Sequence, residues 1–141
     1  DTATAVLEWE SDNEGSSFIG KHRGYERFRE GLHYERSMVL TKGSLEITDT
    51  FSCLEESDRL EWCFTFAPKV VLRRDKGMVL ATLDRRIIRI IPEAGADLSI
   101  GDTTCSPAYG VEVPTVKLIL RLGILRTGVG RHVTRFEWEN L

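Results

Sequence analysis

Cysteine and histidine are scarce in this 141-residue chain, which holds three of each. The cysteines (Cys53, Cys63 and Cys105) include no C-x-x-C pair, and an odd number does not suggest a disulfide framework. We expect them to be free thiols buried in the interior, as unpaired cysteines usually are. Three scattered histidines give no obvious metal cluster.

Other features are missing as well. Lys and Arg number 19 against 22 Asp and Glu, a net charge of −3, whereas a nucleic-acid binder normally carries a basic excess. No apolar run approaches the ~18 residues of a membrane span, so we expect neither a nucleic-acid partner nor a span. The G-x-S-x-G, P-loop, H-E-x-x-H and G-x-G-x-x-G patterns are all absent, which excludes the enzyme classes they identify.

What the chain does contain is alternation of apolar and polar residues, the period of a β-strand. Residues 60–66 and 116–122 show it most clearly, and turn-forming stretches such as Lys42-Gly43 and Gly101-Asp102 recur every 8–12 residues. We therefore predict an all-β fold, an antiparallel β-sandwich of about ten to eleven short strands without a substantial helix, formed by residues 1–141 as a single domain. The expected strands are 3–10, 16–22, 31–41, 44–52, 58–67, 69–73, 77–82, 85–91, 96–100, 113–125 and 130–138.

Three short segments have chemistry of interest. Residues 21–28 (KHRGYERF) place an imidazole, a phenol and several cations beside a glycine. Imidazole and phenol can both transfer protons, and loops at a sandwich rim can present them to a ligand. The alternative is a turn with a tyrosine lid and solvated arginines. Residues 105–110 (CSPAYG) are typical of a tight turn, a short extended stretch with an aromatic anchor, or a rigid corner.

Asp49 is the third feature, because its carboxylate lies on the apolar face of its strand. If Lys42-Gly43 is a two-residue hairpin loop, Asp49 pairs with Arg36, and Tyr34 is its diagonal neighbour. A buried carboxylate needs a partner, and a guanidinium forks a carboxylate well. The alternative is a metal ligand assisted by a nearby histidine.

Five stretches of the chain follow one another in a specific order. A His-x-Gly-Tyr-x-Arg pattern at residues 22–27 precedes residues 32–36 (LHYER) and 47–51 (ITDTF), and residues 65–68 (TFAP) and 106–110 (SPAYG) come later, with Pro114 beyond them. Together they resemble the C-terminal β-sandwich of the heparinase II/III-like polysaccharide lyases, over roughly residues 5–138.

This resemblance implies a larger protein in which an α/α toroid precedes the sandwich. The implied reaction is β-elimination on uronic-acid-containing polysaccharides, with the principal Tyr and His or Asn groups on the toroid and a rim residue from the sandwich. We therefore expect the chain alone to be inactive. The catalytic candidates are His22, Tyr25 and Tyr34, and the candidates for binding substrate are Arg23, Arg27 and Arg29.

The resemblance also implies, in several members, a structural zinc held by two His and an Asp. Asp49 matches that Asp, but Tyr34 and Thr65 stand at the histidine positions, and His33 is only adjacent to the first. A structural zinc site needs about four ligands. We therefore expect no metal and no cofactor, with Arg36 or Tyr34 bonded to Asp49 instead.

Two non-catalytic functions remain open. A module that only binds an acidic glycan would rely on Arg85, Arg86, Arg89, Lys117 and Arg121, and a purely structural sandwich would only buttress the toroid. The expected partners are the missing toroid and, through the parent protein, an acidic polysaccharide. An exposed apolar face would also allow a dimer. The compartment stays open, and is periplasmic or extracellular if the parent degrades polysaccharides.

Overall fold

The computed structural model describes residues 4–123 and 127–139. Within these residues the chain forms eleven strands and a single-turn 3-10 helix, η1 (Gly24–Arg27). None of the described helices has the length and apolar character that crossing a membrane requires. The strands are β1 (Thr4–Ser11), β2 (Gly15–His22), β3 (Tyr34–Thr41), β4 (Ser44–Leu54), β5 (Arg59–Thr65), β6 (Val71–Asp75), β7 (Met78–Leu83), β8 (Arg86–Pro92), β9 (Asp97–Ala108), β10 (Val111–Gly123) and β11 (Gly128–Trp138).

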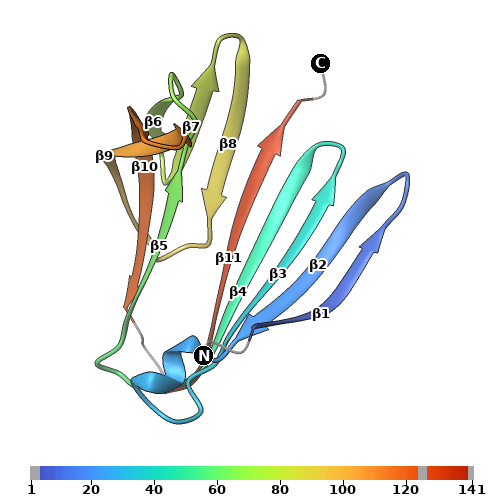
Figure 1. Ribbon diagram of the computed structural model, residues 1–141, viewed down its shortest axis with the longest axis vertical. Coiled ribbons are helices and arrows are strands. Elements are labelled where there is room, and N and C mark those ends of the chain that lie inside the picture. The colour runs from blue at the N-terminus through green and yellow to red at the C-terminus, as the bar shows by residue number, and fades with distance from the viewer. Residues whose placement is uncertain (1–3, 124–126, 140–141) are drawn as a thin grey trace.

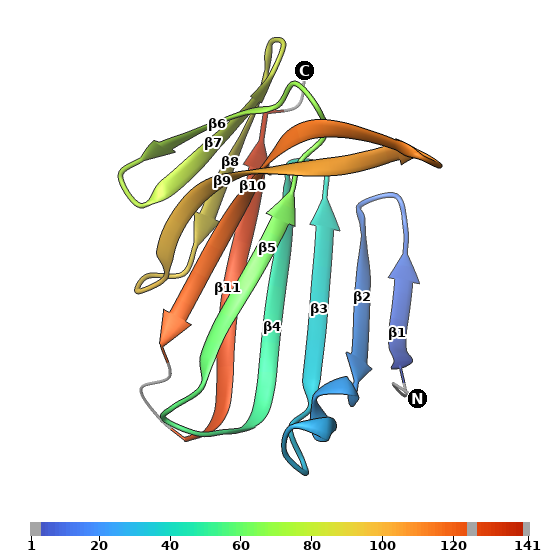
Figure 2. The ribbon, with the colours of Figure 1, turned by 60° about the vertical axis from the view of Figure 1, so that its left-hand side comes forward.

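The strands form two antiparallel sheets. The large sheet has the order β1-β2-β3-β4-β11-β8-β7-β6, and the small sheet has the order β5-β10-β9. The small sheet lies in front of the middle of the large one, and β1 and β2 extend beyond it (Figures 1 and 2). The prediction of an all-β antiparallel sandwich is confirmed.

The core lies between the two sheets, where alternating side chains from both meet. Val79 and Ile90 of the large sheet and Leu118 and Leu120 of the small sheet are completely buried, and Trp62 of β5 packs among them. Leu118 and Leu120 lie two residues apart, so the period-2 pattern directs both toward the core.

One row of side chains across the large sheet shows where the small sheet stops covering it. Register pairs Trp9 with Phe18, Phe18 with Met38, Met38 with Ile47, and Ile47 with Thr134, so all five point to the core-facing side. Ile47 is 5% exposed and Thr134 1%, whereas Trp9 is 68% exposed. The inner face of the large sheet therefore continues as an uncovered surface over β1, β2 and β3.

The strand predictions are wrong mainly at one place. Residues 101–108, expected as turns and a rigid corner, continue β9, and the turn comes at Tyr109 and Gly110. Residues 111–116 of β10 have no ladder partner on β5, and with the end of β9 they project as an arm (Figure 2). Of residues 101–116 only Thr115 is buried, where its hydroxyl donates to the Phe66 carbonyl over 2.7 Å, so the apolar alternation that marks a strand is weak there. Elsewhere the predicted strands differ from the observed ones by a few residues at their ends.

The cysteines are free, as expected, but the expected burial is wrong. Cys53 and Cys63 are exposed, and Cys105 is half-buried. Cys63 lies on the outward side of β5, because alternation turns its neighbours Trp62 and Phe64 toward the core. Cys53 has a positive φ of 55°, which interrupts the alternation near the end of β4.

Candidate functional site

His22 is the last residue of β2, where the chain leaves the sheet for η1. The backbone N–H of Gly24 donates to His22 Nδ1 over 3.1 Å. Since Nδ1 accepts this bond, the proton of the neutral imidazole sits on Nε2. His22 is half-buried, so the loop fixes its ring while leaving part of it accessible.

An aromatic cluster supports this imidazole. The ring centroid of His22 lies 5.1 Å from that of Tyr25 and 5.0 Å from that of Tyr34. Tyr34 lies 4.8 Å from Phe51, which in turn contacts Trp62 in the core at 6.4 Å. The three catalytic candidates are therefore brought together, and stacked or edge contacts tie them to the interior.

Asp49 anchors the cluster from below. Its side chain is fully buried, and it accepts a 2.5 Å hydrogen bond from the Tyr34 hydroxyl and two from Arg36, 2.7 Å from Nε and 3.0 Å from Nη2. Arg36 and Asp49 are direct partners across β3 and β4, as the two-residue loop predicted. Burial, followed by the bond to Asp49, raises the pKa of Tyr34 well above its usual value. The Tyr34 hydroxyl therefore stays protonated and donates a hydrogen bond to Asp49.

The residues around Asp49 do not fit a zinc ion. Both carboxylate oxygens are engaged by the Arg36 guanidinium, which supplies the positive charge that a metal would bring. His33, the displaced histidine, bonds Glu26 instead, with 2.7 Å between Nε2 and Oε1. In the described part of the chain no three His, Cys, Asp or Glu side chains gather as a metal set would.

His132 is a residue that the sequence interpretation missed. It pairs with Asp49 across β4 and β11, is 1% exposed, and stacks on Trp62 with 4.7 Å between centroids. Its Nε2 is buried without a hydrogen-bond partner. Burial lowers the pKa of His132, against the smaller opposing effects of Glu93 and Asp49. The signal was available, because alternation along the predicted strand 130–138 turns position 132 inward with position 134.

The three candidate arginines have different environments. Arg23 and Arg27 are exposed, and the guanidinium of Arg27 lies 4.7 Å from the ring centroid of Phe28. Arg29 is instead bonded to the β4–β5 loop, with a fork to Asp58 at 2.8 and 2.9 Å and a bond to the Cys53 carbonyl. Arg29 thus fastens η1 to the sandwich, whereas Arg23 and Arg27 keep their charge at the surface.

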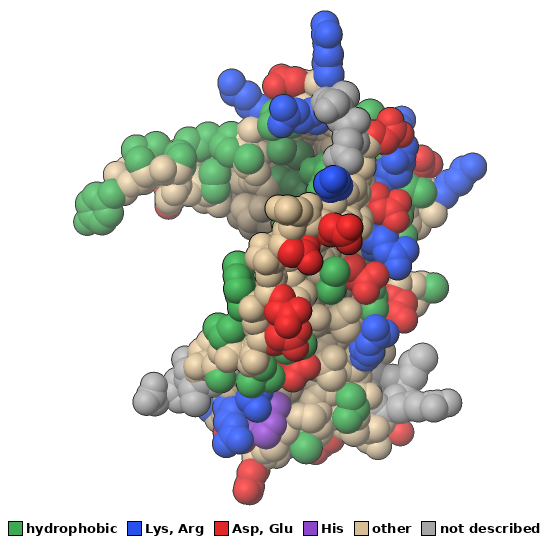
Figure 3. Space-filling model, turned by 90° about the vertical axis from the view of Figure 1, so that its right-hand side faces the viewer, with side chains coloured by type: hydrophobic (Ala, Val, Ile, Leu, Met, Phe, Trp, Pro, Cys, Tyr) green, Lys and Arg blue, Asp and Glu red, His purple; other side chains and the backbone are tan. Residues whose placement is uncertain are grey.

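A hollow lies between the projecting β9–β10 arm and the body of the molecule (Figure 3). Figure 3 shows hydrophobic side chains along the projecting arm and on the body below it, with an open space between. Val6 and Trp9 of β1 are 63% and 68% exposed, and Tyr109 and Val111, at the tip of the β9–β10 hairpin, are exposed as well. Contiguous exposed apolar surface of this kind is typical of an interface.

Comparison with known proteins shows which family and which solved folds the chain matches. Residues 2–139 match the family described as "Heparinase II/III-like, C-terminal". The fold matches a solved heparinase III, the BT4657 gene product, with a TM-score of 0.76 and 12% identity, over 98% of this chain and 21% of that one. The heparan sulfate lyase HepC from Pedobacter heparinus matches with a TM-score of 0.75 and 16% identity, over 98% and 22%. No protein of curated function matches in sequence. The chain thus spans about a fifth of these lyases, and identities this low show the fold alone.

Proposed function

The chain belongs to the heparinase II/III-like C-terminal family, and from that membership we propose that it is the β-sandwich part of a polysaccharide lyase. In this proposal it supplies residues to the rim of a cleft whose other wall is an N-terminal α/α toroid. The substrate is a polysaccharide that contains uronic acid, and the reaction is β-elimination. The observation that carries the proposal is His22, held by Gly24 and by two tyrosine rings beside an uncovered apolar face.

In β-elimination a base removes the proton on the carbon α to the sugar carboxylate. A C=C bond forms, the bond from the β carbon to the glycosidic oxygen breaks, and that oxygen takes up a proton. His22 is suited to the donating side of this chemistry, because the bond from Gly24 to Nδ1 leaves the neutral ring with an N–H at Nε2. We assign it a hydrogen bond to substrate, to the carboxylate or to the departing oxygen.

The neighbouring candidates take different parts in this proposal. Tyr25 is 36% exposed and contacts His22, so its hydroxyl is the second group that substrate can reach. Tyr34 acts as a positioning residue, because its hydroxyl is engaged by Asp49 and its ring supports His22. Arg23 and Arg27 contact the anionic chain from the surface, where charge attracts ligand over a distance of about 10 Å at ordinary ionic strength.

The uncovered inner face of β1 to β3 and the β9–β10 arm are the surface we assign to the toroid. A domain seated between the arm and the body below it would cover apolar side chains on both (Figure 3), and Trp9 and Val6 of β1 and Tyr109 of the arm are exposed apolar residues available for such a contact. His22 ends the strand that carries this surface, so a domain docked there would bring its own acid and base close to the imidazole.

The test is elimination activity, measured as the ultraviolet absorbance of the unsaturated uronate product, over a panel of acidic polysaccharides. We expect no turnover from the 141-residue chain and turnover from the longer parent polypeptide. In the parent, His22→Ala should lower kcat/KM by about 10²-fold, the lower end of what a positioned proton donor contributes.

Two variants sharpen this test. His22→Gln retains an N–H donor at the side-chain end and should keep more activity than His22→Ala. His33→Ala removes a histidine of the same region that is paired with Glu26, and should leave kcat/KM within about threefold of the parent value. Turnover by the chain alone, or equal activity of His22→Ala and the parent, would contradict the proposal.

A further inference from the structure

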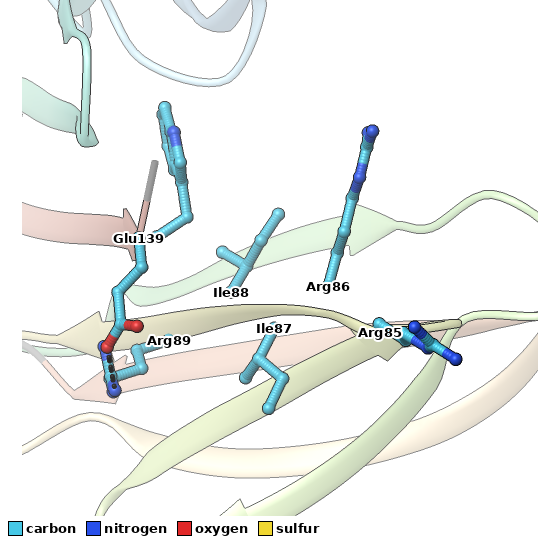
Figure 4. Close-up of a pocket in the computed structure, with 7 residues that line it drawn as sticks. Arg85, Arg86, Ile87, Ile88, Arg89 and Glu139 are labelled. Carbon is cyan, nitrogen blue, oxygen red and sulfur yellow. Dashed lines mark hydrogen bonds and ion pairs between the residues drawn. The ribbon is translucent and has the colours of Figure 1, made fainter. Parts of the chain in front are cut away.

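A notch lies at the opposite end of the large sheet from His22. β11 ends at Trp138, which pairs with Ile88 of β8, while β8 begins two residues farther on, at Arg86. Among the described residues, positions 85–87 therefore have no partner on the β11 side. A cavity of about 530 Å³ fills this notch, lined by residues 85–89 together with Trp138 and Glu139 (Figure 4). Its volume lies within the range of small-ligand sites, about 300–1,000 Å³.

The floor of the notch is apolar, and a hydrogen bond fixes the orientation of its Trp138 ring. The indole N–H of Trp138 donates to the Lys42 carbonyl over 3.1 Å, which holds the ring by its edge. Direct pairing places Trp138 beside Ile88 on the same side of the sheet. In Figure 4, Arg86 stands on that side next to Ile88, at the open end of the notch. A fixed aromatic and aliphatic surface beside a guanidinium can pack the C–H face of a sugar ring while pairing with an anionic substituent.

The notch is positively charged, and part of this charge is not engaged in ion pairs within the described residues. Arg89 is paired with Glu139 at 3.3 Å, but within the described residues Arg85 and Arg86 form no ion pair. Arg121, by contrast, is bonded to Glu61 at 2.7 Å and to Ser99. Of the basic residues that the sequence offered for glycan binding, the structure thus gathers only those of residues 85–89 into one cavity.

We propose that this notch is a second binding site, which holds a sugar unit of an acidic polysaccharide and takes no part in elimination. A sulfate or carboxylate substituent pairs with Arg86, Arg85 adds positive charge from the other side of the strand, and the ring packs on Trp138 and Ile88. The choice of an acidic polysaccharide as ligand rests on the proposed function. His22 lies at the level of Gly130 on β11, eight residues and about 26 Å along the strand from Trp138, so the notch is separate from the His22 site.

The experiment titrates the 141-residue chain with four probes by calorimetry. Heparin carries sulfate and carboxylate groups, dextran sulfate carries sulfate only, polygalacturonate carries carboxylate only, and dextran carries neither. We expect heparin and at least one of the single-anion probes to bind, and dextran not to bind. Which single-anion probe binds identifies the group that the arginines recognise.

The matched variants are Arg86→Ser and Arg131→Ser, which remove the same charge from different places. Arg131 is exposed and lies seven residues from Trp138 along β11. Arg86→Ser should weaken binding about tenfold, as expected for loss of a charge-assisted hydrogen bond, and Arg131→Ser less than twofold. Arg85→Ser provides a second notch variant, and the unfolding midpoint of each variant shows that it folds.

Three results would overturn the proposal: no binding of any anionic probe, equal weakening by Arg86→Ser and Arg131→Ser, or unchanged binding in both notch variants. Failure here is distinguishable from failure of the proposed function. Elimination is measured in the parent protein with His22 variants, and His22→Ala in the 141-residue chain should leave the affinity of the notch unchanged.

Discussion

Replacement of Arg36 by alanine should destabilise the sandwich far more than loss of a surface ion pair. The Asp49 side chain is completely buried, and Arg36 supplies two of the three hydrogen bonds that it accepts. Arg36→Ala leaves a buried carboxylate bonded only to Tyr34. Removing one partner of a buried ion pair costs about 3–5 kcal/mol. Because the Arg36 side chain is 32% exposed, we expect the lower end, about 3 kcal/mol, which in a domain of this size lowers Tm by roughly 10 °C.

The control is Arg135→Ala. Arg135 pairs with Glu46 at 3.0 Å, but the two side chains are 49% and 38% exposed, and such surface pairs contribute about 0–1 kcal/mol. Both variants are compared by urea unfolding, followed through the fluorescence of the tryptophans, of which Trp62 is 6% exposed in the core. Equal slopes of free energy against urea show that the unfolded states are comparable.

A double replacement separates the two explanations of a large effect. If the cost arises from an uncompensated buried charge, Arg36→Met combined with Asp49→Leu should recover most of the stability, because an apolar pair of similar volume often matches a buried ion pair. If Arg36→Ala costs no more than Arg135→Ala, the carboxylate does not depend on the guanidinium and our account of the anchor is wrong.

Three further predictions follow from buried or crowded groups and from the uncovered face. Burial lowers the pKa of His132 in the folded state below its usual 6.5, so the unfolded state binds more protons and the free energy of unfolding should fall as the pH drops below about 6.5. In urea titrations between about pH 7.5 and 5.5, His132→Gln should reduce this fall. Trp9→Ser should reduce any self-association of the chain seen by light scattering, because Trp9 is 68% exposed on the uncovered face; unchanged association would place the contact elsewhere. Gly15→Ala should lower Tm, since a Cβ there would meet the Leu40 carbonyl oxygen at 2.3 Å, whereas Gly123→Ala meets nothing within 4 Å and should leave Tm nearly unchanged.

The parts of the fold that were predictable are those where local pattern and burial agree. Residues 44–52 and 58–67 alternate cleanly because one side of each strand faces the core, and they contain most of β4 and all of β5 as expected. The pairing of Arg36 with Asp49 followed from a two-residue loop at Lys42-Gly43, since loop length fixes the register of a hairpin. This one register brought Tyr34 to Asp49 and so built the base of the candidate site.

The parts that were not predictable depend on contacts between distant segments. The β9–β10 arm has little apolar alternation because most of its residues are exposed or half-buried, and only the pairing of β9 with β10 makes residues 101–108 a strand. The bond between Arg29 and Asp58 joins residues 29 positions apart, so the local sequence does not show that this guanidinium is paired with a carboxylate. The notch at Trp138 arises because β11 stops at Trp138, opposite Ile88, and does not extend to the first residue of β8, Arg86. This relation between the ends of two paired strands is not contained in any local sequence pattern.

The large sheet carries two kinds of surface, and the contrast between them argues for two kinds of contact. Toward β1 the core-facing row continues as exposed Trp9, a large apolar side chain that water solvates poorly and that a packed domain would bury. Toward the end of β8 the exposed groups are guanidinium ions around a small apolar floor, which a domain could bury only at the cost of desolvating their charge. The first surface therefore suits a protein partner and the second a flexible anionic chain. His22, at the end of β2, lies at the edge of the first of these surfaces.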